Sequence, residues 1–172
     1  MPPLATTMTP LDSSQQGITQ WPDGNTAAGG QGGSFAGVQC EASETFHIHA
    51  HLTIFRDGVQ LAVPAEIGIV PSCRYALHTH DRSGLIHVEA AAPVSFTLGQ
   101  FFALWGQTLS ASNVAGLSDP NIAFYVRDPD AGTGLQRFEG DPATIPLAAH
   151  REITIQIGSA PAEVPIYDWS NL

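Results

Sequence analysis

The chain has 172 residues and a mass of 18.2 kDa, the size of one domain with a single apolar core. Only 13% of its residues are charged, whereas 17 are Gly and 13 are Pro, which favours a turn-rich β protein over a bundle of long helices. Its six basic residues are all Arg and oppose 16 carboxylates, giving a formal net charge of −10. This balance excludes function classes that need a basic surface, such as binding to nucleic acids or anionic membranes.

Neither a membrane span nor a signal peptide is expected from the hydropathy pattern. No stretch approaches the roughly 18 consecutive apolar residues of a spanning helix. The opening residues lack a basic region followed by an apolar region, so they do not form a signal segment. A soluble chain is expected.

The composition divides the chain into three parts. Residues 1–37 are dominated by Pro, Thr, Ser, Gln and Gly, which predicts a flexible arm. Trp21 and Phe35 are exceptions within it, because lone aromatic residues in a polar arm often dock on a domain or a neighbouring subunit. Residues 38–160 form the expected β-rich metal-binding domain. The tail, 161–172, is expected to pack on that domain or on a partner, so the arm and the tail are the candidate contacts of a homo-oligomer.

Short strands dominate the first half of the predicted domain. Alternating residues over 46–55, a turn at 56–58 and a second alternation over 59–63 predict a hairpin. A short apolar run follows at 67–70. Two further strands, 75–79 and 85–89, are expected on either side of a turn at Asp81–Gly84.

One helix signal stands in the middle of the chain. Leu98, Phe101, Phe102 and Trp105 recur at helical spacing, Thr97 or Ser95 can cap the start, and Gly106 can end the helix. Strands are then predicted at 122–127 and 153–157, separated by a long connection, 128–146. The expected fold is a single mainly β domain, a β-sandwich or a small open barrel with one short helix.

Six of the seven histidines lie between positions 47 and 87, which is the most informative feature of the sequence. On a strand, residues two apart share a face. His47, His49 and His51 should therefore project together, as should His78 and His80, with His87 and Glu89 on a further strand. Paired imidazoles on neighbouring strands are typical ligands of zinc or copper. The alternative is a solvated or structural histidine cluster.

The candidate metal ligands outnumber the donors that one site needs. They are His47, His49, His51, His78, His80 and His87. The surplus implies either two sites or some imidazoles that orient the ligands. Glu89 and Asp81 could hold ring N–H groups or move a proton as catalytic groups; alternatively, Asp81 opens a turn and Glu89 ends a strand. His150 is isolated and is expected at the surface.

The two cysteines precede the histidine pairs at similar distances. Cys40 lies seven residues before His47, and Cys73 five residues before His78. A Cys40–Cys73 disulfide beside the site is the preferred interpretation. Thiolate ligation of a soft metal and two free thiols remain open. Because Met1 and Met8 are the only methionines, a thioether-rich Cu(I) carrier is disfavoured.

Several segments together resemble a family of exported bacterial and archaeal proteins without an assigned activity. They are HIHAHLTIFRDG, VPAEIGIV, CRYALHTHDRSGLIHVE and FTLGQFFALWG, which span about residues 46–106. The resemblance implies a periplasmic or secreted location and a histidine-lined site, and it strengthens the expectation of a disulfide. It names no metal.

Three functions are compatible with these patterns. The preferred hypothesis is a soluble extracytoplasmic protein that holds Cu(II) or Zn(II) for metal handling or sensing. The second is a three-histidine metalloenzyme, hydrolytic or oxygen-using, in which Glu89 or Asp81 transfers the proton. The third is an interaction module whose histidine cluster is structural. A metal site with four protein ligands would favour a metal-binding or structural role, and a site with three protein ligands and an open coordination position would favour an enzyme.

Overall fold

A computed structural model describes residues 1–40 and 44–172. The fold is mainly β, with one α-helix among the described residues and with sheets that do not close into a barrel, which confirms the predicted fold class. None of the described helices is long and apolar enough to cross a membrane. The elements are β1 (Leu4–Pro10), β2 (Ile18–Thr19), β3 (Phe46–Arg56), β4 (Val59–Ala62), β5 (Ile69–Val70), β6 (Cys73–Arg74), β7 (Leu77–His78), β8 (Leu85–Ala90), α1 (Leu98–Trp105), β9 (Asn113–Val114), β10 (Leu117–Ser118), β11 (Ile122–Arg127), η1 (Pro129–Ala131), β12 (Gln136–Phe138), η2 (Pro142–Thr144), β13 (Glu152–Ile157) and β14 (Val164–Asp168).

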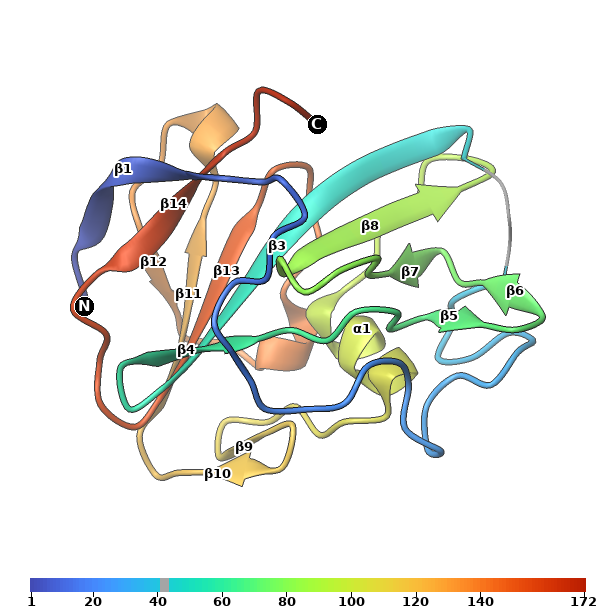
Figure 1. The fold of residues 1–172 in the computed structure, drawn as a ribbon, viewed down its shortest axis with the longest axis horizontal. Coiled ribbons are helices and arrows are strands. Elements are labelled where there is room, and N and C mark those ends of the chain that lie inside the picture. The colour runs from blue at the N-terminus through green and yellow to red at the C-terminus, as the bar shows by residue number, and fades with distance from the viewer. Residues whose placement is uncertain (41–43) are drawn as a thin grey trace.

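The long strand β3 organises the main sheet, whose order is β12-β11-β13-β3-β4-β2 (Figure 1). Its C-terminal half, His51–Arg56, pairs in parallel with β13. Its N-terminal half, Phe46–His51, pairs antiparallel with β8, which in turn pairs with β7. The two halves of β3 therefore have different neighbours.

The hairpin predicted around the Asp57–Gly58 turn is confirmed. Arg56 pairs with Val59 across a two-residue connection, and both turn residues have positive φ, 49° at Asp57 and 80° at Gly58. Such turns match the twist of a hairpin, and Asp-Gly is a favoured sequence for them.

The predicted helix is also confirmed, as α1. The Thr97 side chain accepts a hydrogen bond from the Gln100 backbone N–H, the Gln100 side chain accepts one from the Thr97 N–H, and Gly106 ends the helix at φ 82°. Five residues of α1 are buried in the core against one face of the sheet. They are Leu98, Phe101, Phe102, Leu104 and Trp105.

The first 37 residues, whose composition predicts a flexible arm, contain a strand and a buried tryptophan that the composition did not indicate. β1 pairs in parallel with β14 near the other end of the chain. Trp21 is buried, packs edge-on against Trp105 at 5.2 Å between ring centroids, and donates its indole N–H to the carbonyl of Ala115 at 2.9 Å. Because an indole buries a large apolar area and needs one acceptor, Trp21 fastens an otherwise polar segment to the domain.

The connection predicted over 128–146 contains structure that the sequence pattern did not indicate. β12 adds an edge strand to β11 through the Phe124–Phe138, Tyr125–Arg137 and Val126–Gln136 pairs. The predicted strand 75–79 is, in contrast, reduced to the two residues of β7.

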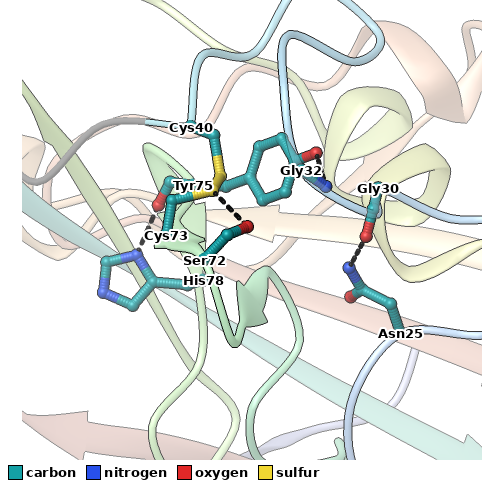
Figure 2. Close-up of a disulfide and its surroundings, with 8 residues drawn as sticks. All are labelled: Asn25, Gly30, Gly32, Cys40, Ser72, Cys73, Tyr75 and His78. Atoms are coloured by element: carbon teal, nitrogen blue, oxygen red, sulfur yellow. Dashed lines mark hydrogen bonds between the residues drawn. A yellow bond between two sulfur atoms is a disulfide. The ribbon is translucent and has the colours of Figure 1, made fainter.

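A disulfide joins Cys40 to Cys73, with Cα atoms 5.7 Å apart, as expected (Figure 2). Beside it, Cys40 forms an isolated β-bridge with Tyr75, whose hydroxyl accepts a hydrogen bond from the Gly32 N–H at 2.9 Å. The disulfide thus ties the segment before β3 to the strand that leads into β7. Disulfides persist in oxidising compartments, so this bond favours such a location.

Candidate metal centre

Strand register brings the histidines together. The β3–β8 pairing sets His47 opposite Glu89 and His49 opposite His87, and the β8–β7 pairing sets His78 opposite His87. Directly opposed residues have side chains on the same face, about 4.5–5.5 Å apart at Cβ. Two ladders therefore gather imidazoles from three strands around His87, and His80 follows just after β7.

Six residues form this His–Glu cluster. They are His47, His49, His78, His80, His87 and Glu89. Within the described residues, two overlapping groups have ligand atoms close enough to hold a metal ion, each within 4.8 Å of one another. The first comprises His78, His80, His87 and Glu89, and the second His47, His49 and His87. His87 belongs to both groups and is the centre of the cluster.

The Nδ1 atom of His87 faces three other donor atoms at short range. It lies 3.1 Å from His49 Nε2, 3.4 Å from His47 Nε2 and 3.5 Å from Glu89 Oε1. His87 Nδ1 has a single lone pair or a single hydrogen atom, so a hydrogen bond satisfies one of its three contacts, such as that to His49, while His47 can donate to Glu89 Oε1 instead. A cation at this point would satisfy all of them at once.

Glu89 brings a negative charge into the cluster. It is 4% exposed, and its Oε1 atom lies 3.2 Å from His47 Nε2 and 3.5 Å from His78 Nε2. Its other oxygen, Oε2, lies 2.9 Å from Nη2 of Arg74 but accepts no hydrogen bond among the described residues, so charge rather than hydrogen-bond alignment holds this pair. Arg74 also pairs with Glu44. The arrangement directs Oε1 towards the imidazoles.

The tautomer of His78 leaves a buried acceptor without a donor. Its Nδ1 lies 2.8 Å from the carbonyl oxygen of Tyr75 (Figure 2), which can only accept, so Nδ1 carries the hydrogen. The opposite nitrogen, Nε2, then presents a lone pair, is fully buried and has no hydrogen-bond partner among the described residues. It points towards the oxygen of Glu89, another acceptor. Buried acceptors of this kind indicate a missing cation or proton.

Burial keeps three of the cluster imidazoles neutral. Loss of water, with a smaller contribution from neighbouring imidazoles, lowers the pKa of His78 to about 3, that of His87 to about 2 and that of His49 to about 4. At neutral pH these rings are uncharged and offer lone pairs, the form that binds metal ions.

His51 is an exception to the predicted ligand set. Its Nε2–H donates to the carbonyl of Ser83 at 2.8 Å, its Nδ1 accepts from the Thr53 hydroxyl at 3.3 Å, and its ring stacks on Tyr167 with 3.6 Å between centroids. Both nitrogens are therefore occupied, and His51 lies outside both candidate groups. It shares the strand face of His47 and His49 but is buried, and burial lowers its pKa to about 3.

Two other candidates have local roles. The Asp81 Oδ1 atom accepts a hydrogen bond from the Ser83 backbone N–H at 2.8 Å, so this carboxylate shapes the turn before β8 and belongs to neither group. The His150 Nδ1 atom lies 2.9 Å from a carboxylate oxygen of Asp130, and its ring packs on Trp169. His150 is also outside both groups.

Sequence reasoning did not identify Arg74 or the Tyr75 carbonyl. Arg74 follows Cys73 directly and is one of only six cationic side chains, a combination that could have drawn attention to it. The backbone carbonyl of Tyr75 carries no signal in the sequence. Comparisons of the chain with protein-family models, with curated proteins and with solved structures found no match.

Proposed function

We propose that this protein binds a divalent transition-metal ion, Cu(II) or Zn(II), in its His–Glu cluster and serves in metal handling or sensing outside the cytoplasm. The contacts of His87 Nδ1 at 3.1–3.5 Å carry this proposal. Ligand atoms at 2.0–2.1 Å from a tetrahedral ion are about 3.3–3.4 Å from each other. The three distances from His87 Nδ1 therefore match the spacing of neighbouring ligand atoms in a coordination shell.

The donor types support the same conclusion. Imidazole nitrogens suit zinc and copper, and one carboxylate oxygen would reduce the net charge of the site by one. One group offers nitrogens of His78, His80 and His87 with an oxygen of Glu89, and the other offers nitrogens of His47, His49 and His87. The disulfide and the resemblance to exported proteins support an extracytoplasmic location.

Elemental analysis of protein purified without chelator and without a metal-affinity tag tests the proposal. One ion per chain is expected in the wild type, with loss in His87→Ala because this residue belongs to both groups. His150→Ala is the matched control, since it removes an imidazole outside both groups. Wild-type protein that neither contains nor takes up Cu(II) or Zn(II) would overturn the proposal.

The position of Glu89 favours a metalloenzyme as a second candidate function. Its Oε1 atom touches three imidazole nitrogens, those of His47, His78 and His87, at 3.2–3.5 Å. A carboxylate so close to a metal-bound water could accept its proton. Glu89→Gln separates the two functions: retained metal with loss of hydrolysis of an activated ester favours the enzyme, and weakened metal binding favours Glu89 as a ligand.

A further inference from the structure

A pocket of about 320 Å³ adjoins the His–Glu cluster. Two cluster residues, His80 and His87, form part of its wall, and Leu11, Leu85 and Leu172 supply apolar surface. This volume lies at the lower end of the range of small-molecule sites, about 300–1,000 Å³. The pocket is thus large enough for a small organic molecule in contact with two of the candidate ligands.

The N-terminal segment that forms one wall is fastened to the turn before β8. The Gln16 N–H donates to the carbonyl of Arg82 at 3.0 Å. The Arg82 side chain reaches back to Asp23 at 3.0 Å and donates to the Thr19 hydroxyl at 2.7 Å. These contacts join the segment carrying Leu11 to the turn carrying Asp81, so the pocket is built by the fold.

The lining of the pocket selects against anions. Asp81 places a carboxylate in the wall, and the chain carries a formal charge of −10. The adjacent cation, Arg82, is already paired with Asp23. A negatively charged ligand would be attracted by a bound metal ion, but it would lie beside the Asp81 carboxylate with no unpaired Arg82 side chain to offset that repulsion. A neutral molecule with an apolar body avoids this repulsion and buries leucine surface.

We infer that this pocket binds a small neutral molecule with an apolar body and one nitrogen or oxygen donor, which coordinates the metal ion of the cluster from the side of His80 and His87. This inference rests on the proposed function. His80 is exposed and has no hydrogen bond from its ring to another described residue, so it is the candidate ligand that an incoming donor displaces most easily. The exchange replaces one neutral donor by another and leaves the charge of the metal unchanged.

Titration of the Cu(II)-loaded full chain with 4-methylimidazole and with azide tests the inference. Binding to the metal shifts the visible absorption band of Cu(II). We expect a saturable shift with 4-methylimidazole and at least about tenfold weaker binding of azide, a difference of about 1.4 kcal/mol. The metal content is measured at the end of each titration, so that removal of the ion is distinguished from ligand binding.

Two substitutions fill the pocket without changing a candidate ligand. Leu11→Trp and Leu172→Trp should each lower the affinity for 4-methylimidazole at least about tenfold, while the Cu(II) content stays at the wild-type level. Val59→Trp is the matched control, because Val59 is also exposed and lies outside the pocket. Leu172 is half-exposed near the chain end, so its replacement tests the pocket even if Leu11→Trp disturbs folding.

The outcomes separate the two proposals. Three results with a Cu(II)-loaded chain would overturn the inference but leave the metal site in place. They are no band shift with 4-methylimidazole, tighter binding of azide than of 4-methylimidazole, and wild-type binding of 4-methylimidazole by both pocket variants. A chain that takes up no metal overturns both.

Discussion

The two halves of β3 carry the same type of side chain on the same face and use it differently. His49, in the half that pairs with β8, has a neutral ring whose Nε2 faces another imidazole at 3.1 Å. His51, two residues later, has both nitrogens hydrogen-bonded and a ring covered by Tyr167 of β14. His51 is thus held by its hydrogen bonds and by the cover of β14, whereas His49 belongs to a group that could hold a metal ion.

Gly84 lies where these halves meet, and its replacement should have the largest effect. It has φ 90°, and a Cβ there would lie 2.9 Å from His51 Cε1 and still closer to the Leu52 carbonyl oxygen. We expect Gly84→Ala to lower the free energy of unfolding by about 3–5 kcal/mol, measured by urea denaturation. Gly116→Ala is the control, because its φ is 85° but nothing lies within 4 Å. Equal losses in both variants would contradict the close-approach argument.

The disulfide secures the chain before the uncovered half of β3. Its cysteines are 33 residues apart, so the Cys40→Ser and Cys73→Ser double variant should lose about 3–4 kcal/mol of unfolding free energy in the loop-entropy model. Because Arg74 and Tyr75 follow Cys73 directly, metal affinity should fall as well. An unchanged urea midpoint together with unchanged metal affinity would show that strand pairing alone maintains the fold and the candidate site without the disulfide.

Acid should destabilise the metal-free protein through His51, the histidine that Tyr167 covers. Burial lowers the pKa of His51 to about 3, below the value of about 6.5 in an unfolded chain. Between these values the unfolded chain binds the extra proton, so stability is complete above about pH 6.5 and falls as the pH decreases. His51 alone accounts for about 3 kcal/mol at pH 4. Urea midpoints that do not change between pH 7 and pH 4 would exclude this effect.

Alanine substitution at His49 and at His51 directly tests the contrast between the two halves of β3. His51→Ala leaves the Ser83 carbonyl without its donor and should lower the free energy of unfolding by about 2–3 kcal/mol while metal is retained. His49→Ala should change stability by less than about 1 kcal/mol and weaken metal binding. Denaturation and elemental analysis on both variants measure the two effects. Loss of metal in His51→Ala, with the fold intact by circular dichroism, would contradict the separation.

The smallest effect is expected at the hydroxyl of Tyr167. Thr53 Oγ1 donates to His51, so the Tyr167 hydroxyl, 2.7 Å away, donates to Thr53. Tyr167→Phe keeps the ring stacked on His51 but removes this donor, for a loss of about 1 kcal/mol of unfolding free energy. A larger loss, or any change in metal content, would show that the hydroxyl has a further role.

Local patterns predicted the elements whose neighbours are close in sequence. The β3–β4 hairpin follows from alternation around Asp57–Gly58, and α1 follows from Thr97 and Gly106 at its ends. β1 and β14 were not predicted as strands, because each pairs with a partner at the opposite end of the chain and β1 is mostly exposed or half-buried. Neither hydrophobic periodicity nor turn residues report such a partner.

The candidate site, too, could be predicted from the sequence only as far as local patterns along each strand allow. Spacing of two along a strand placed His47 with His49 and His87 with Glu89, and the register of β3 with β8 brings these pairs together. Alternation alone assigned His51 to the same set. Its separation from that set depends on the carbonyl of Ser83, 32 residues away, on the Thr53 hydroxyl, and on the ring of Tyr167, and alternation along the strand indicates none of these contacts.

The order of the strands in the chain has a consequence for synthesis. The candidate ligands lie within residues 47–89, whereas β13, which occupies the other edge of β3, comes from residues 152–157. During synthesis or export, β3, β7 and β8 emerge well before the strand that completes the sheet. Under the proposed function, a metal ion would therefore meet these imidazoles before the sheet is complete, and its binding would help to direct folding.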